Sequence, residues 1–276
     1  MHVKGLPGTF TPGTIISTKT GLTVSYAELL ADLSEVQVVY VGEQHTNPHH
    51  HQIQLKVIKA LVRSDPSLTV GMEMFDRTYQ PVLDLWSAGK LDQQIFLQRV
   101  HWYANWRFNF ELYGDILYFV REKNLKLVGL NIPFHIPPKI ATGGIESLSP
   151  AEKSYLPEKI DTSNPRHRDY VARVFERHHV KGRENFGFFY EAQCVWEDAM
   201  AESVAQISRE RKTVVLVGNG HIIYKFGIPE RAYRRTQSNY RTIYLVGAGR
   251  SAERSYADYL WLTPPRKDPP KGKMPG

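Results

Sequence analysis

The sequence predicts an α/β protein with a mostly parallel sheet, helices on both faces, and a helical cap. Three observations lead to this fold class. Short apolar runs rich in β-branched residues recur along the chain, helical patterns separate most of them, and one long segment interrupts the alternation. Because strands that alternate with helices form parallel sheets covered on both faces, the first two observations predict the sheet. The long segment predicts the cap.

Five runs have the composition of strands. Each is short, apolar and rich in valine, isoleucine or leucine, as expected for a strand that is buried on both faces. These runs are Val36–Val41, Leu68–Met72, Leu125–Leu130, Thr213–Val217 and Thr242–Val246.

Three amphipathic patterns predict helices between these strands. The first begins at Thr46-Asn47-Pro48, which supplies an N-cap and a proline suited to the first helical position. The second carries its apolar residues from Phe110 to Val120 and ends just before the third strand. The third runs from about Tyr190 to Ile207, with apolar residues at the spacing of one helix face.

Two segments depart from the alternation. Phe75–Arg107 predicts two short helices and an aromatic stretch, whereas residues 133–189 form a long excursion with one helical piece around Asp169–His179. We therefore expect a single α/β domain over residues 1–263, with a helical cap at about 133–189. Residues 264–276 are rich in proline and lysine without periodicity, and we expect them to be disordered.

The composition excludes several classes of protein. No run of about 18 apolar residues occurs, so no transmembrane segment is expected. The net charge of +7 has one concentration, Arg231, Arg234, Arg235 and Arg241, and no nucleic-acid-binding motif accompanies it. These arginines predict either a solvated surface or a site for carboxylates, such as cofactor propionates. The single cysteine, Cys194, excludes an internal disulfide and a multi-cysteine metal site.

Two tetrapeptides of the same pattern, G-x-x-H, each follow a predicted strand. They are Gly42-Glu43-Gln44-His45 and Gly218-Asn219-Gly220-His221. Ligands of open α/β sheets bind outside the carboxyl ends of the strands, so the two histidines predict one site assembled from distant parts of the chain. The alternative is that two unrelated histidines follow two strands.

Polar residues at the ends of other strands enlarge this candidate site. Glu43 precedes the first histidine, and Glu73 and Asn131 follow the second and third strands. Two imidazoles and a carboxylate, here His45, His221 and Glu73, could hold a divalent metal such as Zn or Mn. The same groups could act as acid–base machinery without metal, or the glutamates could pair with arginines.

Further histidines open the first helix and surround the helix of the cap. In His49-His50-His51, consecutive side chains point about 100° apart, and we expect His50 to be structural. In the cap, His167, Tyr170 and His178 lie near one helix face. A tyrosinate can ligate ferric haem, whereas the alternative is an amphipathic helix whose tyrosine packs on the sheet.

A polar stripe marks the long helix that precedes the fourth strand. Gln193 and Glu197 share one of its faces, and Asp198 lies beside them. The stripe predicts an ordinary solvent face or, alternatively, a face that leans over the strand ends.

Five ordered motifs resemble those of the ChaN-like haem-binding lipoproteins, over roughly Gly13 to Tyr233. They are the segment from Val41 to His50, Glu73-Met74-Phe75, Asn131-Ile132-Pro133, the segment from Gln193 to Ala201, and Gly218-Asn219-Gly220-His221 followed by Gly227-Ile228-Pro229. The G-x-x-H motifs also resemble a wider group that contains erythromycin esterases, TraB/PrgY pheromone-shutdown proteins and Tiki metalloproteases.

The resemblance implies a haem-binding protein of bacterial iron acquisition at the cell envelope. It further implies cofacial haems in a homodimer, axial ligation by a tyrosine, and an outer-membrane haem receptor as a partner. Tyr170 is the expected ligand, with Tyr155 and Tyr190 as competitors, and His167 or His178 would assist it. Because the first residues lack an apolar leader, we expect either a removed leader that anchors or exports the protein, or a cytoplasmic location.

A second hypothesis belongs to another functional class. The paired motif would serve a hydrolase, an esterase or protease, whose catalytic residues are Glu43, His45, Glu73 and His221. The sequence leaves open whether the protein is an enzyme. The duplicated G-x-x-H motif favours the hydrolase, because haem ligation by a tyrosine of the cap does not explain it.

Overall fold

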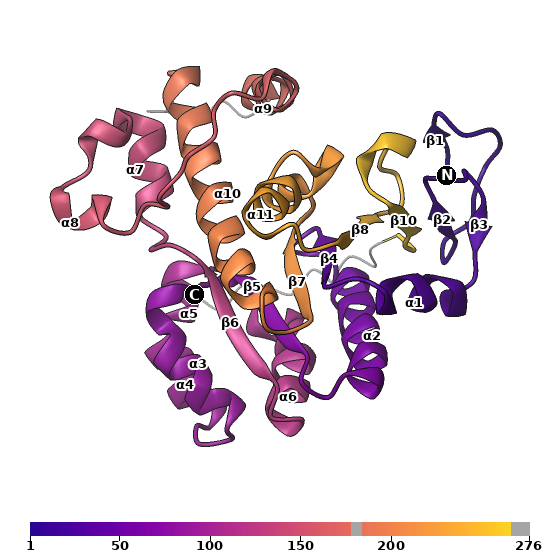
Figure 1. The fold of residues 1–276 in the computed structure, drawn as a ribbon, viewed down its shortest axis with the longest axis horizontal. Helices are drawn as coiled ribbons and strands as arrows, with labels where there is room; N and C mark the ends of the chain where they lie inside the picture. Colours follow the sequence, from indigo (N-terminus) through magenta and orange to yellow (C-terminus); the bar gives the residue numbers. More distant parts are fainter. Residues whose placement is uncertain (178–183, 266–276) are drawn as a thin grey trace, which may run out of the picture.

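An eight-stranded sheet forms the centre of the molecule, as the computed structural model of residues 1–177 and 184–265 shows (Figure 1). The strand order is β3-β2-β10-β8-β4-β7-β5-β6, and neighbours from β10 to β6 are parallel. The fold is therefore α/β with a mostly parallel sheet, as the sequence predicts. The strands are β2 (Ile15–Ser17), β3 (Thr23–Val24), β4 (Val38–Glu43), β5 (Thr69–Asp76), β6 (Lys126–Asn131), β7 (Thr213–Gly218), β8 (Tyr240–Val246) and β10 (Tyr259–Leu262).

All five predicted strands occur, but the sheet extends beyond them. The strand β10 pairs parallel with β8 and antiparallel with β2, so the two ends of the domain meet at this side of the sheet. A separate two-stranded sheet joins β1 (Val3–Lys4) and β9 (Ala252–Glu253). The strand β5 also continues to Asp76, which places Glu73 inside the strand instead of after it.

Helices cover both faces of the sheet because successive strand residues point to opposite sides. Val214 and Leu216 of β7 face one hydrophobic core, and Val215 and Val217 face the other. The first core packs against α1 (Tyr26–Ser34), α2 (Pro48–Ser64), α3 (Gln80–Ser87), α4 (Gln93–Arg99), α5 (Trp102–Asn105) and α6 (Gly114–Glu122). The second packs against α10 (Phe186–Ser208) and α11 (Ile228–Thr236).

The helix α2 begins as its sequence predicts. The side chain of Asn47 caps it by accepting a hydrogen bond from the backbone N–H of His49. His50 is buried: its Nδ1 accepts from the backbone N–H of Gln44 at 2.9 Å, and its Nε2 lies 3.2 Å from Oγ1 of Thr263. Burial lowers the pKa of His50 to about 3, so this imidazole is neutral and structural.

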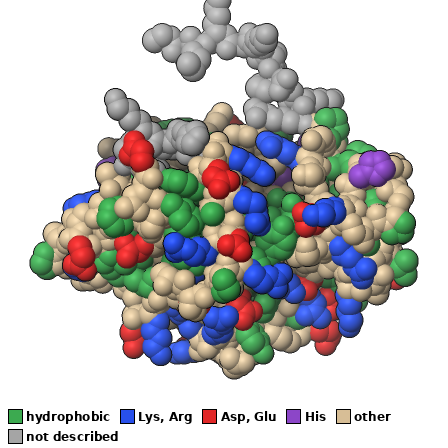
Figure 2. Space-filling view, turned by 90° about the horizontal axis from the view of Figure 1, so that it is seen from above, with side chains coloured by type: hydrophobic (Ala, Val, Ile, Leu, Met, Phe, Trp, Pro, Cys, Tyr) green, Lys and Arg blue, Asp and Glu red, His purple; other side chains and the backbone are tan. Residues whose placement is uncertain are grey.

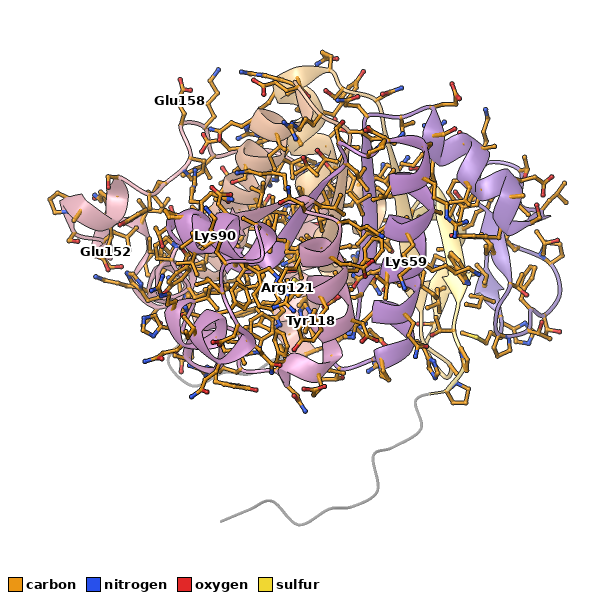
Figure 3. All side chains as sticks on the ribbon, turned by 90° about the horizontal axis from the view of Figure 1, so that it is seen from below. Lys59, Lys90, Tyr118, Arg121, Glu152 and Glu158 are labelled. Atoms are coloured by element: carbon orange, nitrogen blue, oxygen red, sulfur yellow. The ribbon has the colours of Figure 1, made fainter. Side chains whose placement is uncertain are left out.

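Aromatic side chains fill the space between the helices on the α2 side. The rings of Trp86 and Phe96 stack with centroids 4.3 Å apart. The guanidinium of Arg121 lies 4.6 Å from the ring of Trp86 and 5.1 Å from that of Tyr118, and the side chains of Tyr118 and Arg121 lie together on α6 (Figure 3). The long stem of Arg121 thus closes this part of the core toward solvent.

The cap consists of α7 (Ile136–Gly143), α8 (Pro150–Lys153) and α9 (Pro165–Arg177), which lie with the first half of α10 on one side of the molecule (Figure 1). Ile136 and Ile140 of α7 pack against Val195 of α10. His178, predicted as a haem-assisting residue, and most of the predicted tail lie outside the described residues. Within the described part of the chain, no helix has the length and apolarity needed to cross a membrane.

Among residues 1–177 and 184–265, four short 3-10 turns connect elements near the strand ends, and two more lie in the connections between helices. The turn η4 carries the second G-x-x-H motif. The six are η1 (Arg77–Tyr79), η2 (Phe110–Leu112), η3 (Ile145–Ser147), η4 (Asn219–His221), η5 (Ile223–Lys225) and η6 (Arg254–Tyr256).

Candidate functional site

The two G-x-x-H turns meet at the carboxyl ends of β4 and β7. These strands are hydrogen-bonded neighbours, with Glu43 opposite Gly218. A Cβ atom on Gly218 would lie 3.0 Å from Cε1 of His45, and a Cβ atom on Gly42 would lie 2.2 Å from Oδ1 of Asn219. Each turn therefore uses its glycine to admit a side chain of the other turn. The glycines are explained by this close approach.

His45 stands at the open side of the site. Its Nδ1 lies 2.7 Å from Oε1 of Glu43, and its ring packs between Trp106 and Phe108, with centroids 4.9 and 5.2 Å away. The side chain is 31% exposed. Burial lowers the pKa of His45, but the hydrogen bond to Glu43 and the charge of Glu73 outweigh burial, so its pKa lies above the ordinary value. His45 can therefore exchange protons with a ligand from solvent.

Glu43 organises the first turn from a buried position. Its Oε1 also accepts a hydrogen bond from the hydroxyl of Tyr113 at 2.6 Å, and its Oε2 lies 3.2 Å from Nε2 of His51. Burial raises the pKa of Glu43, but the contacts with His45 and His51 outweigh it and hold the pKa well below its usual range. Glu43 is therefore an ionised carboxylate that orients His45.

His221 is held more tightly, between two buried carboxylates. Its Nε2 lies 3.4 Å from Oε1 of Glu73, and its Nδ1 lies 3.4 Å from Oε1 of Glu197. The side chain is 10% exposed, and its ring lies against that of Trp196. Burial lowers the pKa of His221, but the charge of Glu73 and the contacts with Glu197 raise it to about 10. The second histidine is therefore an imidazolium at neutral pH.

Glu73 joins the two halves of the site. Its Oε2 accepts the backbone N–H of Gly218 at 2.6 Å, and its Oε1 faces His221. Burial raises the pKa of Glu73, but the charge of His221 and then that of His45 outweigh it, so the pKa is lowered. Both imidazoles thus lie near one ionised carboxylate, and each has its Nδ1 directed at a further glutamate. Such an arrangement can take up and release protons on either side of a bound group.

Glu197 continues the network from the site into the cap. It accepts a hydrogen bond from Nε2 of Gln193 at 2.7 Å, and its Oε2 lies 3.1 Å from Nε2 of His167 and 3.6 Å from Nε of Arg231. Arg231 also pairs with Asp198. His167, an expected haem-binding residue, is consequently buried and engaged by a carboxylate, with no nitrogen directed to solvent.

Tyr170 lies beside the second turn. Its hydroxyl oxygen is 3.8 Å from the position that a Cβ atom on Gly220 would occupy, and its ring meets that of Tyr224 at 5.9 Å. The residue is half-buried. Burial, followed by the negative charge of Glu197, raises the pKa of Tyr170 to about 12, so its phenol is protonated at neutral pH.

The two competing tyrosines lie elsewhere. Tyr190 is buried in α10, with its hydroxyl 3.4 Å from the carbonyl oxygens of Thr162 and Asn164. Tyr155 is exposed just beyond α8. Of the three candidate ligands, Tyr170 alone borders the turn that carries His221.

The clustered arginines do not form one anion site. Arg241 makes two hydrogen bonds to Asp32, at 2.7 and 2.8 Å. Arg234 pairs with Asp161, while Arg235 and the buried Arg231 pair with Asp198. These guanidiniums are thus neutralised by carboxylates of this chain.

The candidate metal ligands do not form a metal-binding cluster in the described part of the chain. Across residues 1–177 and 184–265, no group of three or more histidine, cysteine, aspartate or glutamate side chains has the arrangement needed to hold an ion. His45, His221 and Glu73 are near one another, yet the contact between His221 and Glu73 has the length of an ion pair.

The structure brings together the two histidines and two glutamates that the sequence predicts at the strand ends, and it adds partners that the sequence does not predict. Tyr113 and His51 on Glu43, and His167 on Glu197, are buried supports that no local pattern marks. The polar stripe of α10 did indicate Glu197 in the sequence, and this stripe is the face of the helix that leans over the strand ends. Asn131 of β6 is also structural: its Nδ2 donates to the backbone oxygen of Glu73 at 3.2 Å.

Comparison with protein families gives one match. Residues 29–232, more than half of the chain, match the family described as haem-binding uptake, Tiki superfamily, ChaN. A search among curated proteins found no match.

Solved structures with a similar fold include the following two. One shows cofacial haem binding to ChaN of Campylobacter jejuni; it has 20% sequence identity and a TM-score of 0.73, and the alignment covers 90% of this chain and 95% of that one. The other is an erythromycin esterase mutant, EreC, in its open conformation; it has 15% identity and a TM-score of 0.51, and the alignment covers 86% of this chain and 77% of that one. At these identities the similarity concerns the fold.

Proposed function

The chain belongs to the haem-binding uptake family of the Tiki superfamily that includes ChaN, and from this we propose that it binds haem in bacterial iron acquisition. The family match carries the proposal, since it spans both G-x-x-H turns and the helix that bears Tyr170. For ChaN of Campylobacter jejuni the binding is cofacial. We propose the same mode for this chain, with two haems stacked between two copies.

Tyr170 is our proposed axial ligand. Bound haem supplies a ferric iron that a phenolate can ligate. The residues fit this group in two respects: the hydroxyl of Tyr170 borders the turn at Gly220, and the half-buried ring adjoins the aromatic side chain of Tyr224. Because burial first and Glu197 second raise the pKa of this phenol, Tyr170 must lose its proton on binding. Because His221 is already protonated and the pKa of His45 is also raised, we assign the released proton to solvent.

Positive charge near Tyr170 supports the binding of haem propionates. Arg173 follows Tyr170 by one turn of α9, so the two side chains share a face. Its charge acts on the phenols of both Tyr170 and Tyr224, although burial has the larger effect on each. On the face seen from above, Lys and Arg side chains are interspersed with Asp and Glu side chains and with hydrophobic patches (Figure 2). We assign Arg173 to a propionate.

The location and partners of the protein complete the proposal. We propose that it works at the cell envelope, periplasmic or membrane-anchored, and passes haem to or from an outer-membrane receptor. A cytoplasmic haem-binding protein is the alternative. Fractionation of cells that express the native gene, followed by detection of the protein, distinguishes the two.

A haem titration tests the proposed function. Addition of ferric haem to the purified protein should give a saturable shift of the Soret band, and Tyr170→Phe should weaken binding and change the spectrum. The matched control is Tyr155→Phe, which alters an exposed tyrosine and should bind as the parent does. Absence of a saturable shift contradicts haem binding, whereas normal binding by Tyr170→Phe contradicts only the choice of ligand.

A hydrolase is the second candidate function, and one observation favours it. His45 and His221 each direct Nδ1 at a glutamate and lie near the shared carboxylate of Glu73. That arrangement suits proton transfer during hydrolysis, with or without a divalent ion such as Zn or Mn, and a tyrosine-ligated haem does not require it.

A matched pair of variants tests the hydrolase. The parent protein is screened against ester and peptide substrates, and its metal content is measured. Glu43→Gln keeps the shape of the residue and should abolish turnover, while Glu122→Gln, which alters an exposed carboxylate at the end of α6, serves as the control. A parent protein that is metal-free and inert against the screen counts against this function.

A further inference from the structure

Four tyrosine rings from distant parts of the chain form one cluster, and Tyr170 is one of them. The ring of Tyr224 meets that of Tyr170 at 5.9 Å and that of Tyr256 at 5.2 Å, and the rings of Tyr256 and Tyr244 are 5.0 Å apart. All four residues are half-buried. Burial and then the neighbouring phenols raise the pKa of Tyr244 and that of Tyr256, so the hydroxyl groups lie within electrostatic reach of one another. Packing explains the rings, but it does not require these hydroxyl groups.

The backbone that carries Tyr224 is strained. Tyr224 and the following Lys225 both adopt left-handed conformations, with φ angles of 54° and 65°. Residues with a side chain are disfavoured there, so they persist only where their surroundings hold them, and they are concentrated at functional sites. Here Nζ of Lys225 lies 2.5 Å from Oδ1 of Asp258, and the ring of Tyr256 supports that of Tyr224. The turn therefore holds the ring of Tyr224 against Tyr170 in spite of the strain.

The hydroxyl of Tyr224 can donate a hydrogen bond toward Tyr170. A phenol carries one proton to donate and lone pairs that accept. Burial raises the pKa of both Tyr224 and Tyr256, and the contact of their hydroxyl groups then lowers that of Tyr224 and raises that of Tyr256. This is the pattern expected when Tyr256 donates and Tyr224 accepts, which leaves the proton of Tyr224 for another acceptor. A phenolate at Tyr170 would be a strong acceptor, because hydrogen bonds to charged groups are the stronger ones.

We propose that Tyr224 is a positioning residue of the haem site, whose hydroxyl donates a hydrogen bond to the phenolate of Tyr170. Tyr256 donates to Tyr224 in turn and orients it. The inference rests on the proposed function, since Tyr170 becomes a phenolate only when it ligates ferric haem. A hydrogen bond to the charged form offsets the burial and the charge of Glu197, which both disfavour that form.

Two porphyrins separate the hydrogen bond from the packing of the ring. Ferric haem engages the phenolate of Tyr170, whereas metal-free protoporphyrin IX has the same outline and no iron. Tyr224→Phe keeps the ring, so in absorption titrations it should weaken ferric haem about tenfold, the effect of losing a hydrogen bond to a charged group, and leave protoporphyrin IX unchanged. The charge-transfer band from phenolate to iron should move to longer wavelength, because the phenolate loses a donor. If protoporphyrin IX does not bind the parent protein, this band decides.

Further variants and outcomes separate this inference from the proposed function. Tyr256→Phe should weaken ferric haem only about twofold, because it acts through Tyr224. Tyr233→Phe, which removes an exposed hydroxyl of α11 outside the cluster, should have no effect. An unmoved charge-transfer band in Tyr224→Phe, or equal losses for the two porphyrins, overturns the hydrogen bond and leaves haem binding intact. A parent protein that binds no ferric haem overturns both the proposed function and this inference.

Discussion

The two G-x-x-H turns share a sequence pattern and a place on the sheet, yet they hold their histidines differently. His45 is 31% exposed and has one short contact, 2.7 Å to Glu43. His221 is 10% exposed and lies between Glu73 and Glu197 at 3.4 Å each. One carboxylate and partial exposure leave an imidazole free to exchange its proton. His221, which is buried between two carboxylates, is instead a fixed cation that neutralises them.

The largest expected effect comes from removing the carboxylate that supports the second turn. Glu197→Gln leaves His221, His167 and Arg231 without their shared negative charge. Breaking a buried ion pair is strongly destabilising, so we expect a loss of about 4 kcal/mol in the free energy of unfolding. Urea denaturation measures it.

The corresponding change in the first turn sharpens the comparison. Glu43→Gln should lower the free energy of unfolding by about 2 kcal/mol, because the partly exposed His45 can become neutral once its carboxylate partner is gone. A Glu197→Gln variant that is no less stable than Glu43→Gln would contradict the distinction between a fixed and an adjustable histidine.

Substitution of the glycine in each turn should lower the free energy of unfolding by a different amount, again measured by urea denaturation. Gly42→Ala places Cβ 2.2 Å from Asn219 and 2.7 Å from Ile222, so overpacking should cost about 3 kcal/mol. The Cβ of Gly218→Ala lies 3.0 Å from the ring of His45. Because this ring can shift, the substitution should lower the free energy of unfolding by only about 1 kcal/mol while displacing His45. Gly114→Ala is the control, since its Cβ finds ordinary contacts of 3.4 Å at the start of α6. Equal losses at Gly42 and Gly114 would show that the turns do not interlock.

The protonated state of His221 predicts how stability depends on pH. Its pKa is raised from 6.5 to about 10, so its contribution is fully present below pH 6.5 and is lost as pH rises through 10. We expect the free energy of unfolding to fall by on the order of 3 kcal/mol between pH 7 and 10. Denaturation across this range, with His221→Gln for comparison, measures the effect. A parent protein whose stability falls no more than that of the variant would contradict the assignment.

A further expected effect concerns the support of the first turn by Tyr113, the residue that precedes α6. Tyr113→Phe removes the hydroxyl that donates to Glu43 at 2.6 Å and should cost about 1.5 kcal/mol. It should also raise the pKa of Glu43, which loses a hydrogen bond to its charged form. Tyr118→Phe, on the exposed side of α6, is the control for the loss of a hydroxyl. Equal losses in the two variants would mean that Tyr113 does not support Glu43.

Local sequence patterns predicted the central strands and the start of α2 because buried runs and N-caps are local features. They missed β10, whose four residues pair with β8 and with β2 from the other end of the chain. Such pairings depend on distant segments. For the same reason His45, His221, Glu43 and Glu73 could be proposed from the strand ends, whereas the contact between His167 and Glu197 could not. That contact depends on how α9 crosses α10.

The reciprocal packing of the two turns also bears on synthesis of the protein. Gly42 receives Asn219, and Gly218 receives His45, so neither turn has its final shape without the other. A nascent chain that ends before β7 contains the first histidine but lacks the surroundings that fix it. Ligand binding at this edge of the sheet must therefore wait until most of the chain has left the ribosome. In a chimaera of two relatives, both turns would have to come from the same parent.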